Sequence, residues 1–136
     1  MAHTLSVLTL QLAQAIGLYW LAAGIGLLLA PTRLAAIIAD IERSPGLAMI
    51  VGLGTFAIGV AILIPHHILY DPLSVVVTSL ALVFAIEGLV LLAVPQILFA
   101  LARPFVAQAR LWAIVSIVLG AVMLLAGATG RADALP

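Results

Sequence analysis

The chain has 136 residues, of which 66% are hydrophobic and 7% are charged, and its formal net charge at pH 7 is zero. Soluble domains carry about 25% charged residues, so this composition excludes an ordinary water-soluble domain and predicts an integral membrane protein. The zero net charge argues against nucleic acid as a partner, and the absence of cysteine excludes disulfides, thiol catalysis and thiolate metal sites.

Four apolar stretches are long enough to cross a bilayer, which takes about 20 residues in a helix. They predict membrane spans at residues 5–30, 46–64, 73–94 and 106–128. Prolines stand at most of the boundaries, where they do not interrupt a helix interior: Pro31, Pro45, Pro65, Pro72 and Pro95. The prediction is an all-α fold, a four-helix membrane bundle forming a single transmembrane domain over residues 1–136.

Arginine sets the predicted orientation of these spans. The connections 31–45 and 95–110 each contain two arginines, whereas the connection 65–72 contains no Lys or Arg. Basic residues are enriched on the cytoplasmic side, so both arginine-bearing loops are expected in the cytoplasm. Both termini and the turn with His66 and His67 are then expected outside.

The two arginine-bearing connections carry a helical pattern of apolar residues. The first has Leu34, Ile37, Ile38 and Ile41, and the second has Ile97, Leu98, Leu101 and Phe105. This spacing predicts a short amphipathic helix at the membrane interface in each connection. The alternative is that each segment extends a neighbouring span.

The two halves of the chain are similar to each other. Gly24 is followed by six apolar or small residues and Pro31, and Gly88 is followed by six such residues and Pro95. We therefore predict a duplication, with halves at about 13–65 and 77–128, each a hairpin of two spans with an interfacial helix. An even number of spans per repeat makes the two copies parallel, related by a pseudo-two-fold axis along the membrane normal. The alternative is chance similarity between apolar segments.

The second half also resembles a known family. Residues 80–127 contain Glu87, Gly88, Leu89 and Pro95, with Gly120 in the following span. This pattern is similar to that of the YjeT-like proteins, small bacterial inner-membrane proteins of unknown function, and implies an inner-membrane protein without known catalysis. In the first half, Ala23 stands where the family has its glutamate. Size and layout are also similar to the DoxX-like four-span proteins.

Glu87 is an ionisable residue inside a predicted span, where such residues are costly and usually face protein, water or a partner. A carboxyl group withdrawn from water favours its neutral form. Tyr19, Thr55 and Ser116 are expected at similar depth. The functional interpretation is a proton-coupled or docking site, and the structural one is an interhelical hydrogen bond.

His66, His67 and Asp71 are the candidates for a metal site, because imidazole and carboxylate groups bind transition metals. Adjacent histidines point in different directions in regular structure, and no soft ligand is present. A polar turn is therefore the preferred interpretation, and no metal or cofactor is expected.

Glycines are expected to let helix backbones approach closely. Those assigned to helix packing are Gly17, Gly24, Gly26, Gly52, Gly54, Gly59, Gly88 and Gly120. The early glycines predict packing between the first and second spans. The alternative is a flat face that binds a partner protein.

An enzyme is the poorest fit, because the spans contain no histidine and no paired carboxylates, and no Ser-His-Asp set is evident. Two hypotheses remain. The first is a non-enzymatic accessory or assembly subunit of a larger bacterial inner-membrane complex, acting by helix packing. The second is a small oligomeric transporter or proton-coupled channel that uses Glu87. Four spans bury little interior, so we expect contacts with membrane lipid and with other subunits or further copies.

Overall fold

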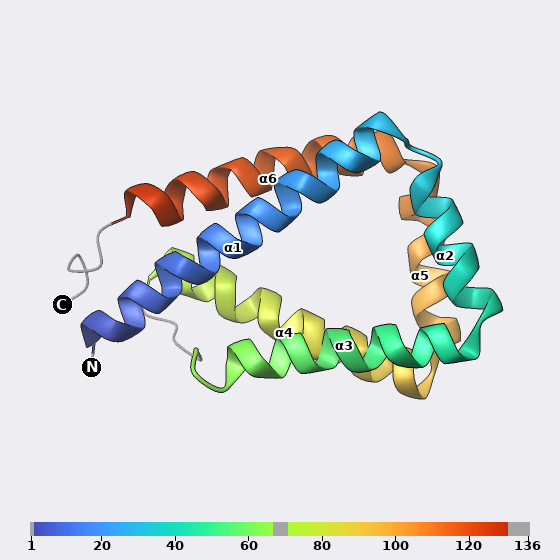
Figure 1. Cartoon of the computed structure of the whole chain (residues 1–136), viewed down its shortest axis with the longest axis horizontal. Coiled ribbons are helices and arrows are strands. Elements are labelled where there is room, and N and C mark those ends of the chain that lie inside the picture. Colours follow the sequence, from blue (N-terminus) through green and yellow to red (C-terminus); the bar gives the residue numbers. More distant parts are fainter. Residues whose placement is uncertain (1, 67–70, 131–136) are drawn as a thin grey trace.

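A computed structural model describes residues 2–66 and 71–130 of the chain, and these residues form six α-helices (Figure 1). They are α1 (Ala2–Leu29), α2 (Arg33–Arg43), α3 (Pro45–Leu63), α4 (Pro72–Ala93), α5 (Pro95–Ala107) and α6 (Ala109–Thr129). The helices α1, α3, α4 and α6 are long and apolar enough to cross a membrane. The all-α fold is confirmed, and each predicted span corresponds to one of these four long apolar helices, which is the pattern of a multi-pass membrane protein.

Proline and polar caps fix most helix boundaries. Pro45, Pro72 and Pro95 each open a helix, where their missing N–H costs no hydrogen bond. Asp71 forms a capping box with Ser74 at the start of α4. The predicted start of the fourth span at residue 106 is wrong. The helix breaks at Gln108, so residues 106 and 107 end α5, and no proline marks this break in the sequence.

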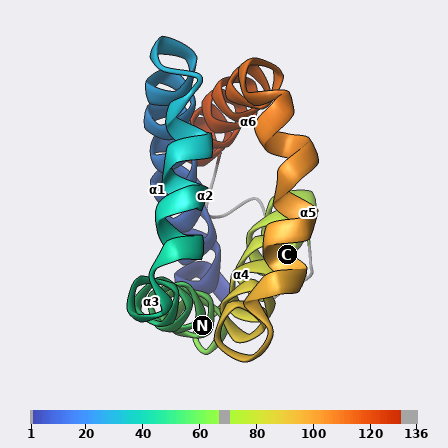
Figure 2. The same cartoon turned by 90° about the vertical axis from the view of Figure 1, so that its right-hand side faces the viewer.

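The helices α2 and α5 are separate from the spans, so the alternative of extended spans is not observed. Neither helix contains a fully buried residue. On α2 the charged residues Arg33, Asp40, Glu42 and Arg43 are exposed. The two helices contact each other and run across one end of the molecule (Figure 2).

The spans pack in two pairs, α1 along α6 and α3 along α4 (Figures 1 and 2). The expected packing between the first and second spans is therefore not found. The reason lies in α2, which has 11 residues. A helix of that length spans about 16 Å, whereas packed helices lie about 8–10 Å apart. Because α2 runs between α1 and α3, it holds their ends too far apart for close packing.

Glycine contacts hold each pair together at backbone distance. A Cβ atom added at Gly120 on α6 would lie 2.6 Å from the Leu21 nitrogen and 2.7 Å from the Gly17 oxygen. A Cβ added at Gly59 on α3 would lie 2.5 Å from the Ala85 nitrogen and 2.7 Å from the Ala81 oxygen. No side chain fits at these separations, so glycine is required for this approach.

Two further glycines serve the same two interfaces. Gly24 lies against the backbone of Ala113 and Ile117 on α6, and Gly88 lies against the backbone of Gly52 and Phe56 on α3. Gly26 and Gly54, which were also assigned to helix packing, take no part in these two interfaces. Gly54 faces open space, and Gly26 has only the Arg33 side chain within 4 Å, because both lie away from the paired faces.

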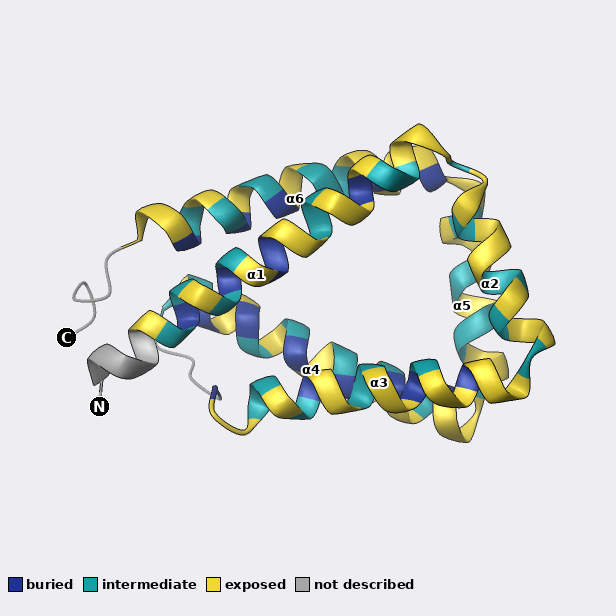
Figure 3. Ribbon diagram, in the orientation of Figure 1, coloured by how far each residue is buried: buried dark blue, intermediate teal, exposed yellow. Residues whose placement is uncertain are grey.

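The two pairs meet at one end and separate towards α2 and α5, which gives the molecule the shape of a wedge (Figure 1). Where they meet, Ala13 and Ile16 of α1, Val77 of α4 and Met123 of α6 form the buried core. Elsewhere the spans expose many large apolar side chains, as expected for surfaces that face lipid (Figure 3).

Candidate functional site

Glu87 lies on α4, six residues before the end of the helix at the wide end of the wedge, and it is partly buried. It follows Phe84 by three residues and Leu80 by seven, so these side chains share one side of α4. Leu80 packs on the core between the pairs. Glu87 therefore continues the side of α4 that faces the other pair, at a point where the pairs have begun to separate. It makes no hydrogen bond or ion pair with the residues that the structure describes.

The other polar side chains predicted at similar depth have different surroundings. The Ser116 hydroxyl donates to the Trp20 carbonyl across the α1–α6 interface at 2.8 Å, and the Thr55 hydroxyl donates to the Val51 carbonyl of its own helix at 2.8 Å. Tyr19 is exposed. The four residues Glu87, Tyr19, Thr55 and Ser116 therefore do not form one site, and the structure brings together only Tyr19 and Thr55.

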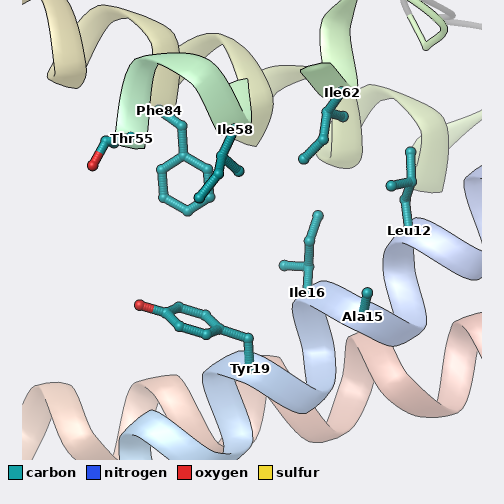
Figure 4. Close-up of a pocket in the computed structure, with 8 residues that line it drawn as sticks. All are labelled: Leu12, Ala15, Ile16, Tyr19, Thr55, Ile58, Ile62 and Phe84. Atoms are coloured by element: carbon teal, nitrogen blue, oxygen red, sulfur yellow. The ribbon is translucent and has the colours of Figure 1, made fainter. Parts of the chain in front are cut away.

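Tyr19 and Thr55 line a cavity of about 280 Å³ between α1 and α3 (Figure 4). The other lining residues are apolar: Leu12, Ala15, Ile16, Ile58, Ile62 and Phe84. The Tyr19 hydroxyl points away from Leu12, towards the wide end of the wedge (Figure 4). Ala15, Tyr19 and Ile58 remain exposed, so the cavity opens sideways between the two spans. Such a space suits an apolar occupant rather than an ion.

A second cavity of about 500 Å³ lies in the corner between α1 and α2, and Tyr19 also lines this cavity. Its α1 wall includes Ala23 and Gly26, and its α2 wall includes Arg33 and Leu34. One guanidinium nitrogen of Arg33 lies 3.4 Å from the position that a Cβ of Gly26 would occupy. This is ordinary van der Waals distance, so the arginine side chain lies against α1 at Gly26, a contact that sequence reasoning missed.

His66, which the sequence analysis assigned to a polar turn, is fully buried. Its Nε2 atom lies 2.7 Å from the Thr9 hydroxyl of α1, and its Nδ1 atom lies 3.0 Å from the Thr78 hydroxyl of α4. The side chain joins the two helix pairs where they meet. No sequence signal distinguishes this histidine, because its partners lie on two other helices.

The remaining metal candidates do not join His66 in a site. Asp71 caps α4 through the nitrogen of Ser74, and His67 lies outside the described residues. Within residues 2–66 and 71–130, no group of three or more His, Cys, Asp and Glu side chains is placed to hold a metal ion.

The structure thus combines four helices that are long and apolar enough to cross a membrane, an apolar cavity between α1 and α3, and an acidic side chain on α4. Comparisons with protein-family models, curated proteins and solved structures find no match for the chain.

Proposed function

We propose that the protein is a non-enzymatic accessory or assembly subunit of a larger bacterial inner-membrane complex and acts by helix packing. The observation that carries the proposal is the carboxyl group of Glu87, which has no bonding partner among the described residues. By contrast, Ser116 and Gln14 bond to backbone carbonyls across the α1–α6 interface. Glu87 is thus available for a contact outside the chain.

The cost of an acidic group inside a membrane supports this interpretation. Carboxyl groups at this depth are normally paired or face a water-filled cavity. A polar side chain or carbonyl on a partner helix, placed against α4, would satisfy Glu87. An interhelical hydrogen bond of this kind contributes roughly 0.6–2 kcal/mol, enough to select one packing arrangement among several apolar ones.

The test is to extract the tagged chain gently from its native membrane and to identify the proteins that copurify. We expect a stoichiometric membrane complex with the wild type and with Glu87→Gln, which retains hydrogen-bonding groups. Glu87→Leu is expected to lose the partner while the purified chain keeps its helicity. Ser79→Leu is the matched control, because Ser79 is an exposed polar residue on the same helix. A wild type that purifies without a partner, or a Glu87→Leu variant that keeps it, would overturn the proposal.

The cavity between α1 and α3 favours a second candidate, an oligomeric transporter or proton-coupled channel that uses Glu87. Its apolar lining, with Tyr19 and Thr55 as the polar exceptions, suits a hydrophobic substrate. In that case the purified protein alone should move such a solute across liposome membranes. Glu87→Gln removes the titratable proton and should abolish the flux, and a fully active Glu87→Gln variant excludes this mechanism.

We also propose that the two halves are a duplication with their interfacial helices in the cytoplasm. The arginines of both connections support the cytoplasmic side, and the glycine contacts support the duplication. Gly24 and Gly88 are 64 residues apart and each meets the second span of the other half. Gly59 and Gly120 are 61 residues apart and each meets the first span of the other half. A pseudo-two-fold axis along the membrane normal would relate these contacts.

A further inference from the structure

The two cavities along α1 adjoin at Tyr19, which lines both, and together they are called the groove. The inner part lies between α1 and α3 and is almost wholly apolar. The outer part lies in the corner between α1 and α2 and carries Arg33. One end of the groove is therefore apolar and the other end is cationic.

Arg33 has no carboxylate partner among the described residues, although α2 also carries Asp40 and Glu42. Its guanidinium group is directed back towards Gly26 on α1. Arginine binds phosphate and carboxylate oxygens through a planar set of donors. Because α2 is amphipathic and lies across the end of the spans, Arg33 is at the depth where lipid headgroups lie.

We propose that this groove binds a single anionic phospholipid, with one acyl chain in the apolar part and the phosphate against Arg33. The apolar part is open to the bilayer through the exposed side chains of Ala15 and Ile58, so a lipid can enter sideways. A small soluble anion would leave that part empty, and an uncharged apolar molecule would leave Arg33 without a counter-charge. The proposal goes beyond the partner contact of Glu87 and does not depend on it.

The length of the groove agrees with one leaflet. Half of a bilayer core about 30 Å thick is about 15 Å, which corresponds to roughly ten helical residues. Counted from Gly26, this distance ends at Ile16, which lines the apolar cavity. A chain that starts beside Arg33 therefore ends at the edge of the buried core, to which Ile16 belongs.

Native mass spectrometry of the detergent-purified chain tests the proposal. The protein is mixed with equal amounts of phosphatidylglycerol and phosphatidylcholine that carry the same acyl chains. Both lipids carry a phosphate, but the choline ammonium group neutralises that of phosphatidylcholine, so we expect the wild type to retain one phosphatidylglycerol with about tenfold preference. Arg33→Gln should abolish this preference. Arg103→Gln should preserve it, because Arg103 lines neither cavity.

Two further variants separate the parts of the groove. Ala15→Trp fills the apolar cavity and should reduce the retention of both lipids. Gly26→Leu occupies the space beside the Arg33 guanidinium and should reduce only the preference for phosphatidylglycerol over phosphatidylcholine. Circular dichroism verifies that each variant keeps its helices. Glu87→Leu should retain the lipid, so failure of the partner proposal is distinguishable from failure of this one.

Three results would overturn the proposal. The first is a wild type without preference for the anionic lipid. The second is an equal loss in Arg33→Gln and Arg103→Gln, which would indicate general attraction to positive charge. The third is displacement of the lipid by glycerophosphate at equal concentration, which would show that the acyl chain contributes nothing.

Discussion

At the scale of single residues, His66 joins α1 to α4 through hydrogen bonds with Thr9 and Thr78. We expect His66→Ala to lower the free energy of unfolding by roughly 1–3 kcal/mol, because the hydroxyl groups of Thr9 and Thr78 each lose a hydrogen bond. The chain has no cysteine, so spin labels at Val7→Cys and Ile64→Cys measure the distance between the two pairs. His66→Ala should lengthen and broaden that distance.

Thr129→Ala is the control for His66→Ala, because the Thr129 hydroxyl donates to the Leu125 carbonyl of its own helix and not to the other helix pair within the described residues. It should leave the distance between the pairs unchanged. An unchanged distance in His66→Ala as well would show that apolar packing alone holds the narrow end together.

At the scale of helices, the spans and interfacial helices could be predicted because hydropathy, proline and apolar spacing are local properties of the sequence. The partner of each span could not be predicted. Gly17 and Gly24 indicate close packing, but a small residue does not specify which helix it meets. The pairing of α1 with α6 depends on the length and direction of α2 and α5, which become clear only in three dimensions.

The candidate site was predictable only in part, for the same reason. The apolar surroundings of Glu87 single it out in the sequence, and its place on α4 agrees with that interpretation. The groove was missed because Tyr19 and Arg33 belong to different helices. Nothing in their spacing shows that α2 folds back over α1.

A pair of glycine substitutions tests the packing of the helices. In Gly120→Ala the added Cβ would collide with the backbone of Leu21, so we expect α1 and α6 to separate and the melting temperature in detergent to fall by several degrees. Gly54→Ala adds the same methyl group in open space and should leave the melting temperature unchanged or raise it slightly. Equal effects of the two substitutions would contradict the close approach of α1 and α6.

At the scale of the whole molecule, each half of the chain depends on the other, since every span packs on a span of the opposite half. We expect residues 1–68 and 69–136, expressed together as two fragments, to copurify as one helical complex. Either fragment alone should be degraded or aggregate. A stable fragment 1–68 would show that α1 and α3 pack on each other without α4 and α6, contrary to the arrangement described here.

The pairing of the first helix with the last also determines the order in which the two helix pairs can form during synthesis. Gly17 meets Gly120, and 103 residues separate them in the chain. At synthesis rates of about 5–20 residues per second, α1 waits in the bilayer for roughly 5–20 s before its partner leaves the ribosome. The α3–α4 pair is complete much earlier. During that interval the glycine-lined face of α1 is covered only by lipid or by a chaperone, and it is then most exposed to pairing with the wrong helix.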